Sequence, residues 1–62
     1  MSAEDSLQRA EQLMERLEQA RGRLKATSDP ETAIEVLTEL AEIAKEVEAA
    51  LSQAKREADA QA

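Results

Sequence analysis

The sequence contains no cysteine, no histidine and no aromatic residue, and its 62 residues include only one glycine and one proline. The lack of cysteine excludes a disulfide framework and favours a protein of the reducing cytoplasm. The lack of His, Cys and Tyr removes the usual general bases, thiol nucleophiles and soft metal ligands. The four serines have no histidine to activate them. We therefore expect no enzymatic activity, no catalytic residue, no cofactor and no metal site.

Large core-forming residues and long hydrophobic runs are also scarce. Of the 26 apolar residues, 13 are alanine, and the others are seven Leu, two Ile, two Val and two Met. A chain this short buries a modest fraction of its surface, so a single copy is expected to be marginally stable. The chain shows no charged-then-apolar leader and no apolar run of about 20 residues, so we expect neither export nor a membrane partner.

Basic residues are fewer than acidic residues in this sequence. The chain has 8 basic and 14 acidic residues, a formal net charge of −6. This balance disfavours nonspecific binding to nucleic acid or to an anionic membrane. Residues 2–25 carry five acidic and five basic side chains, whereas residues 29–60 carry nine and three. All of the excess negative charge is therefore expected on the second half of the chain.

The spacing of the apolar residues predicts two helices. In the first half, steps of three and four residues, with a polar residue at position 21, connect a row on one helix face: Leu7, Ala10, Met14, Leu17 and Leu24. The same spacing returns after the proline and continues from Ala33 to Ala58. We predict helices over residues 3–26 and 30–58.

Local signals mark the turn between these helices. Asp29 fits an N-cap, and Pro30 fits the first helical position that follows it. This predicts a turn at residues 27–29, with a frayed tail at residues 59–62. Gly22 lies inside the first predicted helix, where glycine costs about 1 kcal/mol relative to alanine. Either it permits a close approach of the two helices, or it is tolerated there without a role.

The second predicted helix has an apolar arc about 140° wide, which is more than one neighbouring helix covers. A short turn makes the two helices antiparallel neighbours. We therefore predict an all-α antiparallel two-helix hairpin that self-associates into a four-helix bundle, as a homodimer. The residues predicted at the interface are Leu13, Leu17, Val36, Leu40, Ile43, Val47, Ala50 and Ala54.

A polar row runs along the first predicted helix at heptad spacing: Arg9, Gln12, Arg16, Gln19 and Arg23. One interpretation is an ordinary solvated face, and the other is a recognition strip for phosphates or for an acidic partner helix. Arg21 stands inside the apolar arc of the same helix. It can extend its stem toward Glu35 or mark a site where a partner supplies an acid.

From Asp29 onward the segment "DPETAIEVLTELAEIAKEVEAALSQAKREA" resembles the second helix of the exonuclease VII small subunit. That family follows an acidic, Pro-containing turn with Leu-Glu, then Leu-Ala-Lys, then Leu-x-x-Ala. The matching residues here are Ile34-Glu35, Ile43-Ala44-Lys45, Leu51 and Ala54, and "MERLE" (residues 14–18) is similar to the end of the family's first helix. The family's aromatic-x-x-Gly is Leu37 to Leu40 in this chain. The resemblance implies a non-catalytic accessory subunit that docks on a larger catalytic subunit.

The acidity and the helix–turn–helix layout also resemble the Rop-type plasmid regulators. That resemblance implies a dimer that binds RNA through the polar face of the first helix, although the family's RNA-gripping aromatic has no equivalent here. A designed or purely structural helical bundle without a ligand is a third alternative. Of these, we favour a non-catalytic module for protein–protein interaction and assembly.

Overall fold

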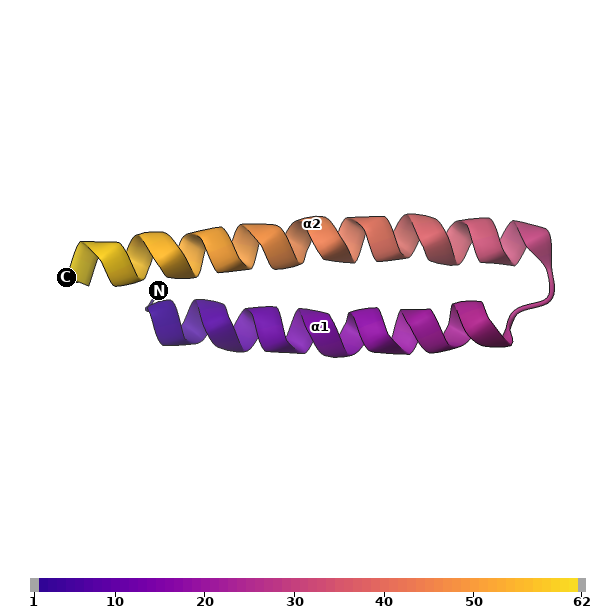
Figure 1. Ribbon diagram of the computed structural model, residues 1–62, viewed down its shortest axis with the longest axis horizontal. Helices are drawn as coiled ribbons and strands as arrows, with labels where there is room; N and C mark the ends of the chain where they lie inside the picture. Colours follow the sequence, from indigo (N-terminus) through magenta and orange to yellow (C-terminus); the bar gives the residue numbers. More distant parts are fainter. Residues whose placement is uncertain (1, 62) are drawn as a thin grey trace.

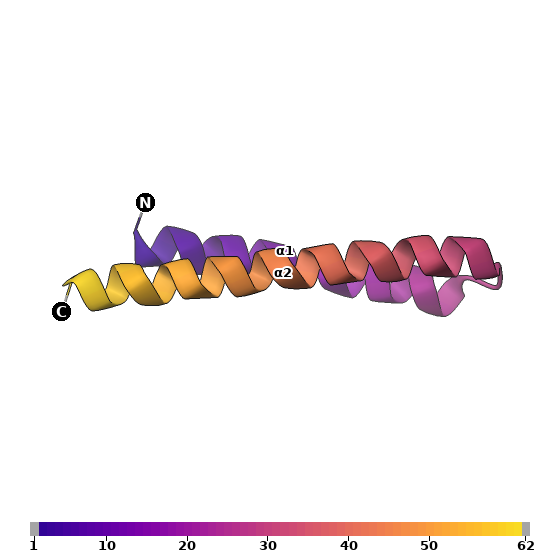
Figure 2. The ribbon, with the colours of Figure 1, turned by 90° about the horizontal axis from the view of Figure 1, so that it is seen from above.

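A computed structural model describes residues 2–61 and shows two long helices packed side by side. Helix α1 spans Ala3–Ala26 and helix α2 spans Pro30–Gln61. The chain reverses direction between them, so the helices are antiparallel (Figure 1). They cross at a shallow angle when seen from above, within a rod of 49 × 14 × 12 Å (Figure 2). The predicted all-α hairpin is confirmed.

Helix α1 begins at residue 3 because Ser2 and Asp5 form a capping box. The Asp5 backbone N–H donates to Ser2 Oγ at 3.2 Å, and the Ser2 N–H donates to Asp5 Oδ2 at 3.3 Å. Two amide donors that have no partner inside the helix are thereby satisfied. At the other end, Arg23 and Lys25 occupy the last turn, where positive charge meets the negative end of the helix dipole.

Helix α2 begins where Asp29 caps its first turn. Asp29 Oδ2 accepts from the Thr32 hydroxyl at 2.6 Å and from the Thr32 backbone N–H at 3.1 Å. Pro30 occupies the first helical position, where its missing N–H costs nothing. Residues 27–29 form the turn between the two helices, and α2 starts at Pro30.

The end of α2 differs from the prediction. The helix continues to Gln61 instead of ending near residue 58, so residues 59–61 are helical rather than a frayed tail, and Ala62 lies outside the described residues. No glycine or proline stops the helix, and alanine and glutamine are good helix formers. Tertiary contact also holds this end, because the Ser6 hydroxyl of α1 donates to Glu57 Oε1 at 2.6 Å.

The core lies between the two helices and is narrow. Leu13 and Ile43 are the largest residues with almost no exposed surface, at 1% and 2%. Four other apolar residues are buried with them: Ala10, Ala20, Val36 and Ala54. Leu17, Leu24, Leu40, Val47 and Ala50 pack against this core and stay half-buried. Since half of these six buried side chains are alanines, the contact between the two helices buries little apolar surface and stabilises the hairpin only modestly.

Gly22 does not serve the close helix approach that the sequence suggested. A β-carbon at this position would meet no atom within 4 Å, and the residue is exposed. Its backbone has no positive φ that would call for glycine. The glycine therefore weakens α1 without a compensating contact in the described hairpin.

Candidate interaction surface

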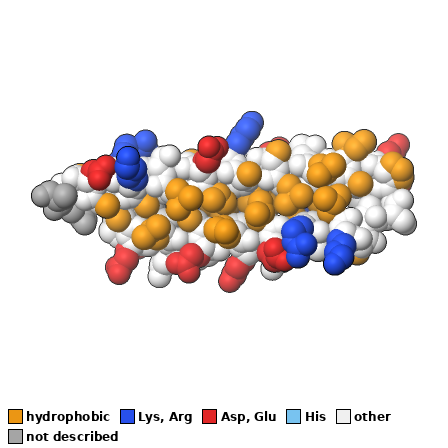
Figure 3. All heavy atoms as spheres, in the orientation of Figure 1, with side chains coloured by type: hydrophobic (Ala, Val, Ile, Leu, Met, Phe, Trp, Pro, Cys, Tyr) orange, Lys and Arg blue, Asp and Glu red, His pale blue; other side chains and the backbone are white. Residues whose placement is uncertain are grey.

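Five large hydrophobic side chains remain exposed among the residues that the structure describes. Leu7, Met14, Ile34, Leu37 and Leu51 are each between 47% and 64% exposed, and we call this set the apolar face. Figure 3 shows hydrophobic side chains gathered in a continuous band along the line where α1 and α2 meet, with charged side chains at its margins. A band this long on a chain this small is typical of an interaction surface.

Helix periodicity places these five residues on one side of the molecule. Leu7 and Met14 are one heptad apart on α1, and Leu37 and Leu51 are two heptads apart on α2. Ile34 precedes Leu37 by three residues and so lies on the same side, toward its outer edge. The half-buried residues Leu17, Leu40 and Val47 lie beside them and extend the band into the core.

The opposite side of the hairpin is charged, and we call it the polar face. The Arg23 guanidinium pairs with Glu39 at 2.7 Å, and the Arg16 guanidinium pairs with Glu46 at 3.8 Å. Both pairs join α1 to α2 across one edge of their contact. On each helix, the buried row separates these charged residues from the apolar face. The hairpin therefore has two chemically distinct faces.

The structure divides the eight predicted interface residues into two groups. Leu13, Val36, Ile43 and Ala54 are buried by the contact between the two helices of one chain. Leu17, Leu40, Val47 and Ala50 are half-buried and keep some surface for a partner. The exposed residues that the interface prediction left out are the five of the apolar face. Their heptad spacing could have identified them from the sequence. They lie on the flank of each apolar arc, however, and the prediction was made from the centre of the arc.

The predicted recognition strip lies on the polar face or at its margin. Arg9, Gln12, Arg16, Gln19 and Arg23 are all exposed. Arg16 and Arg23 are engaged with glutamates of α2, which lowers the positive potential that a phosphate would meet. Arg9 forms no ion pair with another described residue and borders a shallow hollow between the helices.

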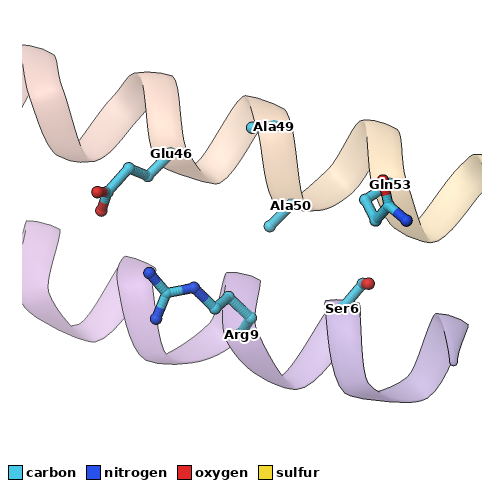
Figure 4. Close-up of a pocket in the computed structure, with 6 residues that line it drawn as sticks. All are labelled: Ser6, Arg9, Glu46, Ala49, Ala50 and Gln53. Atoms are coloured by element: carbon cyan, nitrogen blue, oxygen red, sulfur yellow. The ribbon is translucent and has the colours of Figure 1, made fainter. Parts of the chain in front are cut away.

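That hollow has a volume of about 250 Å³ and lies between the first half of α1 and the second half of α2 (Figure 4). Its lining consists of Ser6, Arg9, Glu46, Ala49, Ala50 and Gln53. The Arg9 guanidinium and the Glu46 carboxylate border the same small space, and Ala49 and Ala50 also line it. Since one positive and one negative side chain line it, the hollow has no net charge to attract an ion of either sign.

Arg21 lies at the margin of the apolar face, one heptad after Met14. Its guanidinium donates to both oxygens of Glu18, at 2.6 Å from Nη2 and 3.1 Å from Nε. These hydrogen bonds, reinforced by the opposite charge, lower the pKa of the Glu18 carboxyl and raise the pKa of Arg21. Arg21 therefore pairs with Glu18 of its own helix and not with Glu35, which was one of the two alternatives for this residue.

Within the described residues, no group of three or more Asp, Glu, His or Cys side chains is arranged to hold a metal ion. Neither of the two described helices contains an apolar stretch long enough to cross a lipid bilayer. A comparison with protein-family models, curated proteins and solved structures finds no significant match for this chain. The features of the molecule that point to a function are therefore the two faces of the hairpin.

Proposed function

We propose that the protein is a non-catalytic interaction module that assembles through its apolar face, with a homodimeric four-helix bundle as the assembled form. The observation that carries this proposal is the exposure of five large hydrophobic side chains on one side of the hairpin. Charged side chains stand at the margins of this hydrophobic band, so the face has a defined edge (Figure 3).

Energetics supports self-association. Covering apolar surface stabilises an assembly by about 25 cal/mol for each Å² removed from water. Among the described residues, the large aliphatic side chains that the two helices of one chain bury are three, Leu13, Val36 and Ile43. A second hairpin placed on the apolar face adds five more large side chains to a shared core. Four helices packed in this way form a bundle with short connections, an architecture that stabilises small helical chains.

A double substitution in α2 tests the role of the apolar face. Leu37→Glu with Leu51→Glu places two carboxylates where the proposed partner packs, and a buried unpaired carboxylate costs several kcal/mol. We expect sedimentation velocity to show a loss of the dimer. Gln12→Glu with Gln19→Glu adds the same charge at exposed positions away from the apolar face, and should leave the dimer intact. Equal masses for the two variants would contradict the proposal.

The accessory-subunit alternative uses the same apolar face with a larger protein in place of the second copy. The resemblance to the exonuclease VII small subunit supports it. A chain that stays single at high concentration, but binds a purified catalytic subunit with a loss of affinity in the Leu37→Glu variant, would favour this alternative over self-association.

The RNA-binding alternative receives less support from the polar face. Two of the three arginines on the predicted strip are already paired with glutamates, and the chain has a net charge of −6. RNA binding through Arg9, Arg16 and Arg23 predicts an affinity that falls steeply with salt. Gel shifts with structured RNA that do not change on Arg16→Glu substitution would remove this alternative.

A further inference from the structure

The two ends of the hairpin differ in what fills the space between the helices. At the end away from the turn, the first turns of α1 and the last turns of α2 lie side by side (Figure 1). We call residues 3–10 and 51–60, which form this end, the terminal end. The Ser6–Glu57 hydrogen bond joins the two segments, so they lie at the same level of the rod.

Large aliphatic side chains fill the space between the helices on the turn side of the terminal end. The continuous core there consists of Leu13, Ala20, Val36 and Ile43. Four large half-buried residues pack against it: Leu17, Leu24, Leu40 and Val47. Burial of this many large side chains holds the two helices of one chain together on the turn side.

Small and polar residues fill the same space at the terminal end. The buried residues here are Ser6, Ala10 and Ala54. An alanine or a serine removes little apolar surface from water, so this part of the helix contact contributes little stability. The hollow between the helices, which Ser6 and Gln53 help to line, lies beside these residues (Figure 4).

The polar contact at the terminal end stabilises it incompletely. The Ser6 hydroxyl donates to Glu57 Oε1 at 2.6 Å, whereas Glu57 Oε2 is buried without a hydrogen-bond partner among the described residues. A buried polar atom without a partner opposes the packing of the helices, because water would hydrate it if they separated. Segments with few buried apolar contacts are the ones that open locally in native proteins. The terminal end has these properties.

The large apolar residues of the terminal end lie on the apolar face instead of in the core. Leu7 of α1 and Leu51 of α2 are each 47% exposed, and these two segments contain no other Leu, Ile, Val or Met. Since the two leucines belong to different helices, one partner surface covers both only when the helices lie side by side. A partner that covers both therefore binds the closed hairpin more tightly than the opened one, and its binding favours closure.

Resting on the proposed self-association, we propose that the terminal end opens in a single copy, and that the second copy closes it by covering Leu7 and Leu51. The turn side stays folded in both forms, because its core lies between the two helices of one chain. Closure is the same whether the two turns lie at one end of the dimer or at opposite ends, since the apolar face is covered along its length in either case. Assembly thus completes the folding of one end of each chain.

Amide hydrogen exchange, followed by mass spectrometry at concentrations that give a single copy and a dimer, tests this closure. In the single copy, residues 51–57 should exchange faster than residues 36–43. In the dimer, the exchange of residues 51–57 should slow by about tenfold or more, the factor expected from covering the exposed half of two leucines. Equal rates for the two segments in the single copy would overturn the opening. An unchanged rate for residues 51–57 in the dimer would overturn the closure.

Matched variants of the apolar face test the role of the two leucines. Leu7→Ala with Leu51→Ala shortens both large side chains of the terminal end, and Ile34→Ala with Leu37→Ala shortens two on the turn side. At a concentration where both variants are dimers, the first should lose the protection of residues 51–57 and the second should keep it. Equal protection of this segment in the two variants would overturn closure through these leucines.

A variant of the inward side tests the cause of the opening without a partner. Ser6→Ala with Glu57→Leu replaces the polar contact by apolar residues, a change that is close to neutral or stabilising when both partners are replaced. It should slow the exchange of residues 51–57 in the single copy. Unchanged or faster exchange would contradict the small, polar core as the cause of the opening.

These outcomes separate the closure from the self-association. A dimeric mass, with terminal-end exchange that is the same in the dimer and in the single copy, overturns the closure and leaves the proposed function standing. A single-copy mass at every concentration overturns the proposed function and, with it, closure by a second copy.

Discussion

The ionised carboxylate of Asp29 caps the start of α2 by accepting hydrogen bonds from residues of the first turn. The Thr32 hydroxyl, the Thr32 backbone N–H and the Glu31 backbone N–H all favour the carboxylate, and they lower the pKa of Asp29 below its ordinary value of 3.8. The hydroxyl contributes most. The stability that this cap supplies is therefore fully present above pH 3.8 and is lost as the pH falls through the lower pKa of the folded state.

Substitution of Thr32 by valine should raise the pKa of Asp29 toward 3.8, because the largest stabilising hydrogen bond of the carboxylate is removed. Titration of the Asp29 carboxyl carbon by NMR measures the shift. Asp29→Ala should lower the melting temperature at pH 7, and the deficit should shrink in strong acid. A deficit that is the same at pH 7 and at pH 2 would show that the charge of the cap contributes nothing.

Gly22 offers a substitution expected to stabilise the protein. Its position is helical, exposed and free of close neighbours, so alanine fits without strain. Gly22→Ala should stabilise the hairpin by about 1 kcal/mol, which corresponds to a rise in melting temperature of about 4–8 °C for a small domain. Thermal unfolding followed by circular dichroism checks this. A lower melting temperature would mean that the glycine fits a contact that a single hairpin does not show.

At the scale of the elements, the helix boundaries were accessible from sequence because they depend on local chemistry. Ser2, Asp5, Asp29 and Pro30 act on residues within one turn of themselves, so the starts of both helices and the turn could be predicted. The end of α2 depends on Glu57, whose partner Ser6 is 51 positions away in sequence. No local pattern marks that contact.

The candidate interaction surface was only partly predictable for a related reason. Apolar spacing identifies the arc of each helix but not the part of the arc that the other helix covers. The residues at the centre of each arc, Leu13 and Ile43, are buried in the core between the two helices. Met14 and Leu37, on the flanks of the arcs, are exposed. The part of each arc that is buried depends on how each helix is rotated about its own axis. In this hairpin, that rotation brings Arg16 and Arg23 into contact with glutamates of α2.

The Ser6–Glu57 hydrogen bond should anchor the last turns of α2. Ser6 is 2% exposed, and Glu57 Oε2 is buried without a hydrogen-bond partner among the described residues. Removal of the Ser6 hydroxyl would leave Glu57 Oε1 without its hydrogen-bond donor. An unsatisfied buried polar group lowers the free energy of unfolding by about 1–3 kcal/mol. In Ser6→Ala, amide hydrogen exchange should speed up at the C-terminal end of α2 and stay unchanged around Ile43. Uniform exchange along α2 in the variant would contradict a local anchor.

Core and face substitutions in α2 should separate folding from association. Ile43→Ala removes a residue that is 2% exposed and should destabilise the folded chain by about 2–5 kcal/mol. Leu37→Ala, at 51% exposure, should mainly weaken the dimer, so its melting temperature should depend more steeply on protein concentration. Chemical unfolding at several concentrations distinguishes the two. The same concentration dependence in both variants would place Leu37 in the core.

The whole molecule combines a narrow core with an apolar face that runs along much of its length. Its polar face is crossed by two ion pairs, and exposed pairs of this kind are each worth about 0–1 kcal/mol. The chain has no aromatic residue or disulfide to reinforce a single copy. These properties together favour a protein whose folded state is completed by association.

Sedimentation equilibrium of the unmodified chain, across a range of concentrations at neutral pH, measures this association most directly. Self-association through the apolar face predicts a mass of twice the 6.8 kDa chain, shifting toward a single copy on dilution. A mass of 6.8 kDa at every concentration, with full helicity retained, would contradict it.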